Sequence, residues 1–207
     1  MVDLILNRRS RRDGFQARPV PKDTIDTIIA CALAAPSSKN AQPWRIHVVT
    51  SRATLGEIAD AVDSARGAET YVPIDPATGL PRDYESSVSE SAQVLRGVSL
   101  GLFVENRGRF SDGRRVVASA ADGVRENALI GYSLEMVGLG ATIQNMWLAA
   151  SALGLAGVFM GDVLIAEEMI RERLGLAGDL VGVLALGYTE AESFPKRLGE
   201  DRVVLHD

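Results

Sequence analysis

Apolar residues recur along the chain at two spacings, one typical of helices and the other of strands. Five of them between Pro21 and Leu33 fall on one helical face, and Pro36 ends that pattern. The stretch Trp44–Val49 is instead typical of a strand. The same criteria predict further helices at residues 3–6, 55–62, 83–96, 134–153 and 167–174, and strands at 98–104, 158–160 and 180–186. Helices and strands therefore alternate.

Residues 105–115 interrupt this pattern with a polar, turn-rich stretch. It contains Arg107-Gly108-Arg109 and Ser111-Asp112-Gly113, so we expect a variable, exposed loop excursion that shapes access to a site. No linker or repeat divides the 207 residues, of which 46% are hydrophobic. The sequence therefore predicts a single domain over residues 1–207.

Charge and cysteine content narrow the classes of function. A formal net charge of −5 argues against a nucleic-acid partner or an anionic membrane surface. The longest apolar stretch, Met146–Gly161, is shorter than the roughly 20 residues of a membrane-spanning helix. The N-terminus lacks the pattern of a signal peptide, so we expect a cytoplasmic protein. Because Cys31 is the only cysteine, redox chemistry would need a cofactor.

Two polar clusters are candidates for such a site. Residues 8–12, Arg-Arg-Ser-Arg-Arg, combine four cations with a hydroxyl, and guanidinium groups suit phosphate oxygens or the edge of a reduced flavin. A solvated helix end that complements the helix dipole is the alternative. Residues 36–44 form a rigid turn whose amides could bind a planar heterocycle, although they could equally satisfy only the backbone.

Other chemically notable side chains receive structural interpretations. His47 lies in a predicted strand and forms neither a metal cluster nor a triad with other residues. Trp44, Trp147 and Phe159 have mostly apolar neighbours and are interpreted as packing or interface residues. We predict no metal site and no catalytic side chain.

The two polar clusters together resemble a known family. Arg-Arg-Ser-x-Arg at residues 8–12, followed by Pro-Ser-Ser-x-Asn-x-Gln-Pro-Trp at residues 36–44, is similar to the FMN-dependent nitroreductases. Gly140–Met146 and Leu184–Tyr188 extend the resemblance over essentially the whole chain. It implies an α+β fold with a central, mostly antiparallel sheet packed by helices. It also implies an intertwined homodimer with two FMN sites at the interface.

The resemblance also implies which residues bind FMN. The first segment would contact the phosphate, the ribityl chain or the pyrimidine edge, and the second would serve partly the partner subunit's site. The end of a strand would run along the ring, and a basic segment near the C-terminus would bind the phosphate. The implied residues are Arg8, Arg9, Ser10, Arg12, Pro36, Ser37, Ser38, Asn40, Gln42, Met160, Gly161, Lys196 and Arg197.

The implied activity is a two-electron transfer. NADH or NADPH would reduce FMN and leave, and a nitroaromatic, a quinone or a related organic acceptor would then be reduced in the same pocket, with ping-pong kinetics. The early chain lacks Gly-x-Gly-x-x-Gly, so nicotinamide would bind only transiently. Three alternatives stay open: other flavin chemistry on the same scaffold (small-molecule dehydrogenation, flavin breakdown, reductive dehalogenation), a non-catalytic flavin-binding protein, and an interaction module for an acidic partner.

Overall fold

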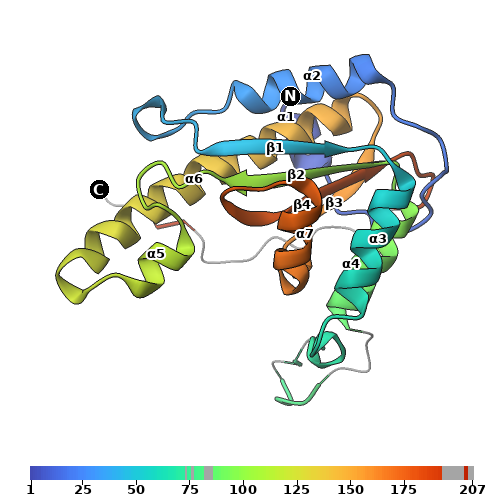
Figure 1. Ribbon diagram of the computed structural model, residues 1–207. Coiled ribbons are helices and arrows are strands. Elements are labelled where there is room, and N and C mark those ends of the chain that lie inside the picture. Colours follow the sequence, from blue (N-terminus) through green and yellow to red (C-terminus); the bar gives the residue numbers. More distant parts are fainter. Residues whose placement is uncertain (73, 76, 82–85, 193–202, 205–207) are drawn as a thin grey trace.

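The computed structural model describes residues 1–72, 74–75, 77–81, 86–192 and 203–204. Helices and strands follow each other in an order close to the predicted one (Figure 1). The elements are α1 (Val2–Asn7), α2 (Lys22–Leu33), η1 (Ser38–Asn40), β1 (Trp44–Val49), α3 (Arg52–Asp63), η2 (Ala68–Thr70), α4 (Ser87–Gly97), β2 (Leu100–Asn106), α5 (Arg114–Ser119), α6 (Asp122–Ala152), β3 (Ala156–Met160), η3 (Asp162–Ala166), α7 (Glu167–Leu174) and β4 (Asp179–Gly187).

The four strands form one sheet in the order β1-β2-β4-β3, and all its neighbouring strands are antiparallel. The central strands β2 and β4 are buried almost throughout, as expected for a sheet covered on both faces. An additional short parallel bridge joins Ser10 to Gly157 on β3. This sheet confirms the predicted α+β class and its mostly antiparallel pairing.

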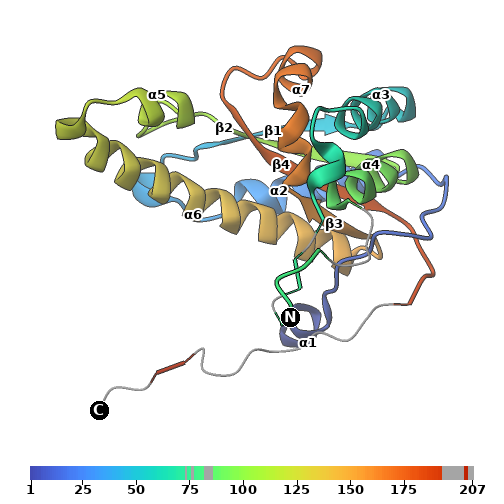
Figure 2. The same ribbon diagram turned by 90° about the horizontal axis from the view of Figure 1, so that it is seen from below.

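Helices cover both faces of the sheet, and each face has its own core (Figure 2). One core lies under α3, α4, η3 and α7 and includes Leu55, Leu95 and Phe103. The other lies under α2 and α6 and includes Ile28, Leu102 and Met146. Alternate residues of each strand point to opposite faces, so the central strands contribute to both cores.

Local signals in the sequence explain several element boundaries. The Ser51 side chain accepts a hydrogen bond from the N–H of Thr54 at 3.2 Å and caps α3, and Ser86 caps α4 in the same way. Gly175 ends α7 at a φ of 69°, a left-handed conformation that glycine adopts without strain. Among the described residues, no helix has the length and apolar character needed to cross a membrane.

The long helix α6 corrects one expected boundary, because it begins at Asp122 and not at Leu134. Its first turns extend with α5 beyond the sheet as an arm (Figure 1). Apolar side chains there face outward, so the core-facing periodicity that predicted the later part is missing. The exposed apolar side chains of α6 are Val124, Leu129, Ile130, Leu134 and Val137.

The stretch 105–115 corrects a second expectation, because part of this polar segment is buried. Glu105, Asn106 and Ser111 are at most 3% exposed. The segment folds onto α6 around the buried carboxylate of Glu135, which accepts hydrogen bonds from the N–H groups of Phe110 and Ser111. Asn106 and Ser111 can be buried because the distant carboxylate of Glu135 accepts their hydrogen bonds.

Candidate functional site

The arginine cluster lies where the chain leaves α1 and joins the edge of the sheet. Arg8 ends α1, and Ser10 then pairs with Gly157 on the edge strand β3. The N–H of Arg11 donates to the carbonyl of Gly157 at 2.9 Å. Backbone pairing therefore fixes the cluster against β3, so its side chains do not depend on a free loop for their position.

Arg8 is the member of the cluster that most clearly needs a ligand. Its guanidinium carbon lies 3.9 Å from the centre of the Trp147 ring. Its Nη1 is buried and has no hydrogen-bond partner in the described part of the chain. Burial, followed by repulsion from Arg9, holds the pKa of Arg8 below its ordinary value. A half-buried cation with a buried donor that lacks an acceptor provides a place for an anion.

A small hollow lies directly beside Arg8. Its volume is about 220 Å³, and Arg9, Arg11, Ser151 and Ala156 also line it. Arg9 donates to the carbonyls of Leu6 and Arg8. Three arginines around one small hollow suit a phosphate group, so the residues present fit the predicted FMN phosphate.

Arg12 and the end of β3 lie further along the same edge. Arg12 forms an ion pair with Glu90 of α4, with Nε and Oε2 3.0 Å apart. The neighbouring Ser91 donates a hydrogen bond of 3.3 Å to Asp162, the residue that directly follows Gly161. Gly161 is exposed and Met160 is buried. Glu90 and Ser91 of α4 therefore bring Arg12 and Gly161 to one region, as expected if both border a flavin ring.

The second cluster is a turn with unusual backbone angles. Lys39, Asn40 and Gln42 have φ values of 49°, 53° and 46°. The hydroxyl of Ser37 accepts a hydrogen bond from the N–H of Gln42 at 3.0 Å, and Asn40 accepts one from the Gln42 side chain. Pro36, Asn40 and Gln42 are exposed, and Ser37 and Ser38 are half-buried. The turn thus presents rigidly held polar groups at the surface.

One chain does not bring these two clusters together. The turn packs beside Gly138 of α6, where an added Cβ would lie 3.3 Å from that of Ser37. Arg8 packs on Trp147, nine positions later, which corresponds to about 14 Å along a helix. Figures 1 and 2 show α1 beside the C-terminal part of α6 and the turn near its middle. Lys196 and Arg197 lie outside the described residues.

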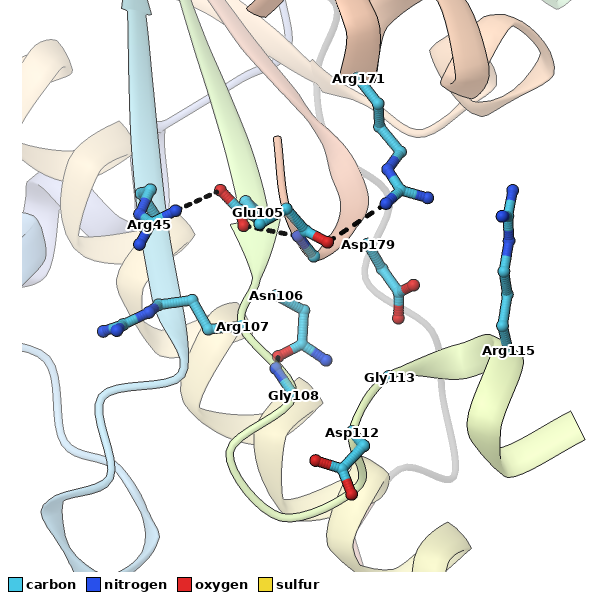
Figure 3. Close-up of a pocket in the computed structure, with 12 residues that line it drawn as sticks. Arg45, Glu105, Asn106, Arg107, Gly108, Asp112, Gly113, Arg115, Arg171 and Asp179 are labelled. Carbon is cyan, nitrogen blue, oxygen red and sulfur yellow. Dashed lines mark hydrogen bonds and ion pairs between the residues drawn. The ribbon is translucent and has the colours of Figure 1, made fainter. Parts of the chain in front are cut away.

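A separate polar hollow of about 310 Å³ contains none of the predicted site residues (Figure 3). At its base the buried carboxylate of Glu105 accepts hydrogen bonds at 2.7 Å from His47 Nε2 and from the N–H of Gly178. Arg45 lies 3.6 Å from the same carboxylate. Burial alone would raise the pKa of Glu105, but His47, Gly178 and Arg45 together lower it. His47 therefore has a structural partner.

Sequence reasoning did not place Trp147 beside the arginine cluster. Its apolar neighbours on α6 indicated packing, and nothing in the local pattern shows that a residue of α1 lies on its ring. Its Nε1 is also buried without a partner among the described residues. The signal that could have found it is the combination of a tryptophan with an arginine cluster near the predicted cofactor phosphate.

Comparisons with known proteins place this geometry in context. The chain is similar to chloronitrobenzene nitroreductase from Comamonas testosteroni, with 28% identity covering 99% of this chain and 93% of the relative. It is 31% identical to the NADH dehydrogenase of Thermus thermophilus, covering 97% and 92% of the two chains. The FMN-dependent nitroreductase from Mycobacterium smegmatis, solved in complex with NADPH, has the same fold, with a TM-score of 0.72 and 19% identity covering 100% of this chain and 97% of the other.

The family model agrees with these relatives and covers most of the chain. Its match extends from residue 5 to residue 188 and so includes the arginine cluster, the polar turn and the end of β3. The resemblance seen in the sequence is thereby confirmed. The chain belongs to the nitroreductase family.

Proposed function

We propose that this protein is an FMN-dependent oxidoreductase that takes electrons from NADH or NADPH and passes them to a nitroaromatic, a quinone or a related organic acceptor. The buried Nη1 of the half-buried Arg8, which has no hydrogen-bond partner among the described residues and lies beside Arg9 and Arg11, is the observation that carries the proposal. It provides an anion site at one end of β3, and Gly161 follows the other end of the same strand. Membership of the nitroreductase family supports the reaction class.

Four of the predicted residues have a defined task in this proposal. FMN, when bound, supplies the two-electron chemistry. Arg8 holds its phosphate, and Arg12 faces the pyrimidine edge, where a cation favours added negative charge. The backbone at Met160 and Gly161 borders the ring. Nicotinamide and acceptor then occupy the same space in turn, so we expect ping-pong kinetics.

The first prediction tests the cofactor and the turnover. The purified protein should be yellow and should release FMN, and not FAD, on heat denaturation. Anaerobic addition of NADH or NADPH should bleach the flavin, and a nitroaromatic or quinone should restore its colour. FMN that stays oxidised with both nicotinamides would favour the non-catalytic flavin-binding protein. Bleaching without reoxidation by these acceptors would favour other chemistry on the same scaffold.

We further propose a homodimer whose two subunits complete each cofactor site. The polar turn lies about 14 Å along α6 from Arg8 in one chain, so a second copy is needed to bring such a turn to the arginines. Apolar residues on the outer face of α6, including Ile130, Leu134 and Val137, provide a surface for it. Ile130, Leu134 and Val137 have helical i, i+4, i+7 spacing and form one stripe.

The second prediction concerns this stripe. Val137 is 73% exposed in the single chain, so Val137→Glu should leave the fold intact but place a charge in the dimer interface. We expect sedimentation at micromolar concentration to show a monomer. FMN titration should show weakened binding. Val137→Thr, which keeps the branched shape, is the control and should stay dimeric. A flavin-loaded parent that sediments as a monomer would contradict the proposal.

A further inference from the structure

Trp147 and Arg8 form a pair in which each side chain has a buried donor without an acceptor. The guanidinium lies 3.9 Å over the indole ring, and neither Arg8 Nη1 nor Trp147 Nε1 has a hydrogen-bond partner in the described residues. We propose that Trp147 is a positioning residue for the cofactor phosphate, which holds Arg8 with its ring and donates its indole N–H to the same anion. This inference rests on the proposed FMN site.

The two free donors call for one ligand with several acceptor oxygens. Buried donors without an acceptor are rare, because each costs the free energy of its lost hydration. Arg8 lines a hollow that Arg9 and Arg11 also line. A neutral acceptor would leave the half-buried charge of Arg8 uncompensated, whereas a phosphate provides both the charge and the oxygens.

The ring of Trp147 fixes where the guanidinium can lie. Arg8 comes directly after the last turn of α1, and a flexible side chain there would lose rotamer freedom on binding an anion. Stacking on an indole face restricts the guanidinium before the ligand arrives, because the ring quadrupole attracts the cation. Preorganisation of this kind strengthens binding without adding a contact.

Simple packing is the competing interpretation of Trp147. A packing role leaves the indole N–H and Arg8 Nη1 unsatisfied in the finished protein. It also predicts that loss of the ring weakens every flavin equally, because the site as a whole would become looser. A phosphate-directed role predicts a selective effect, since riboflavin has the same ring and ribityl chain as FMN but lacks the phosphate.

The third prediction is therefore a change in discrimination between two flavins. FMN and riboflavin would each be titrated into the apo forms of the parent, Arg8→Ala, Trp147→Leu and Trp147→Phe. We expect Arg8→Ala and Trp147→Leu to lower the affinity for FMN roughly tenfold or more, while the affinity for riboflavin stays near that of the parent. Trp147→Phe keeps an aromatic face without the N–H, so its preference for FMN should lie between those of the parent and Trp147→Leu.

A second stacked pair provides the control. Arg18 lies 4.0 Å from the centre of the Tyr188 ring, so Tyr188→Leu removes an interaction of the same type elsewhere. Its preference for FMN over riboflavin should equal that of the parent. Circular dichroism would establish that each variant is folded.

Two results would overturn the inference. An unchanged ratio of FMN to riboflavin affinity in folded Trp147→Leu and Trp147→Phe would exclude a role toward the phosphate. Equal weakening of both flavins would assign Trp147 to packing alone. If the parent itself bound neither flavin, the proposed function would fail together with this inference. If the parent binds FMN and only the Trp147 variants fail to show the expected change, the inference about Trp147 alone is wrong.

Discussion

Replacing Glu135 by alanine is expected to lower the free energy of unfolding by roughly 3 to 5 kcal/mol, because it removes the acceptor on which a whole segment is folded. Glu135 is 0% exposed. Its Oε1 accepts from the N–H groups of Phe110 at 2.5 Å and Ser111 at 3.0 Å. Its Oε2 accepts from Ser111 Oγ at 2.7 Å and Asn106 Nδ2 at 2.9 Å. Alanine would leave these donors without an acceptor.

Glu135→Gln should be less harmful and so tests the mechanism. The amide oxygen can replace Oε1 and keep both backbone donors satisfied. The amide NH₂ then faces Ser111 Oγ, which can accept, but it opposes the NH₂ group of Asn106. We therefore expect a loss of about 1 to 3 kcal/mol, between the parent and Glu135→Ala.

Thermal and urea unfolding at one fixed protein concentration would measure these losses. For a chain of this size a loss of 4 kcal/mol corresponds to a fall in Tm of about 8 to 16 °C. Glu126→Ala is the matched control, because Glu126 is an exposed residue on the same helix. A Glu135→Ala protein as stable as this control would show that the segment does not depend on the carboxylate.

The Glu135 network also shows why part of the fold escaped prediction. Residues 105–115 have the composition of a surface turn. No local pattern reveals that Glu135, 24 positions after Ser111, accepts hydrogen bonds from Ser111 and so allows its burial. The start of α6 at Asp122 was missed for a related reason. Its outward apolar residues follow no core-facing period within the chain, so helical periodicity gave no sign of them.

Elements governed by local rules were predicted well. The strand Trp44–Val49 and the helix Glu167–Leu174 have the expected bounds, because a hydrophobic run in one case and Gly175 in the other define them locally. The candidate site divides in the same way. Its arginines and its polar turn were visible as sequence motifs, whereas the stacking of Arg8 on Trp147 joins residues 139 positions apart in the chain.

The pH dependence of stability should contain a distinct contribution from Glu105. This carboxylate is 1% exposed and joins β1, β2 and the turn before β4 through His47, Arg45 and Gly178. Glu105→Gln should therefore lower the free energy of unfolding by about 3 kcal/mol at neutral pH, since a buried charge network loses its negative member. His47 Nε2 and Gly178 would keep at most a neutral acceptor.

The sign of the acid effect follows from the lowered pKa of Glu105. The unfolded chain has a Glu pKa of about 4.3, so the stabilising contribution is complete above that value. It is lost as the pH falls through the lower pKa of the folded protein, with a slope of up to about 1.4 kcal/mol per pH unit. Parent and Glu105→Gln should therefore differ most near neutral pH and converge in acid.

Urea unfolding from pH 3 to pH 8, with flavin content and protein concentration held constant, would test this convergence. Glu168→Gln is the control, because the Glu168 side chain is 89% exposed and its ion pair with Arg115 is solvated. It should follow the parent at every pH. If Glu105→Gln instead loses stability in acid as steeply as the parent, other carboxylates dominate the acid transition, and the network around Glu105 contributes less than its burial implies.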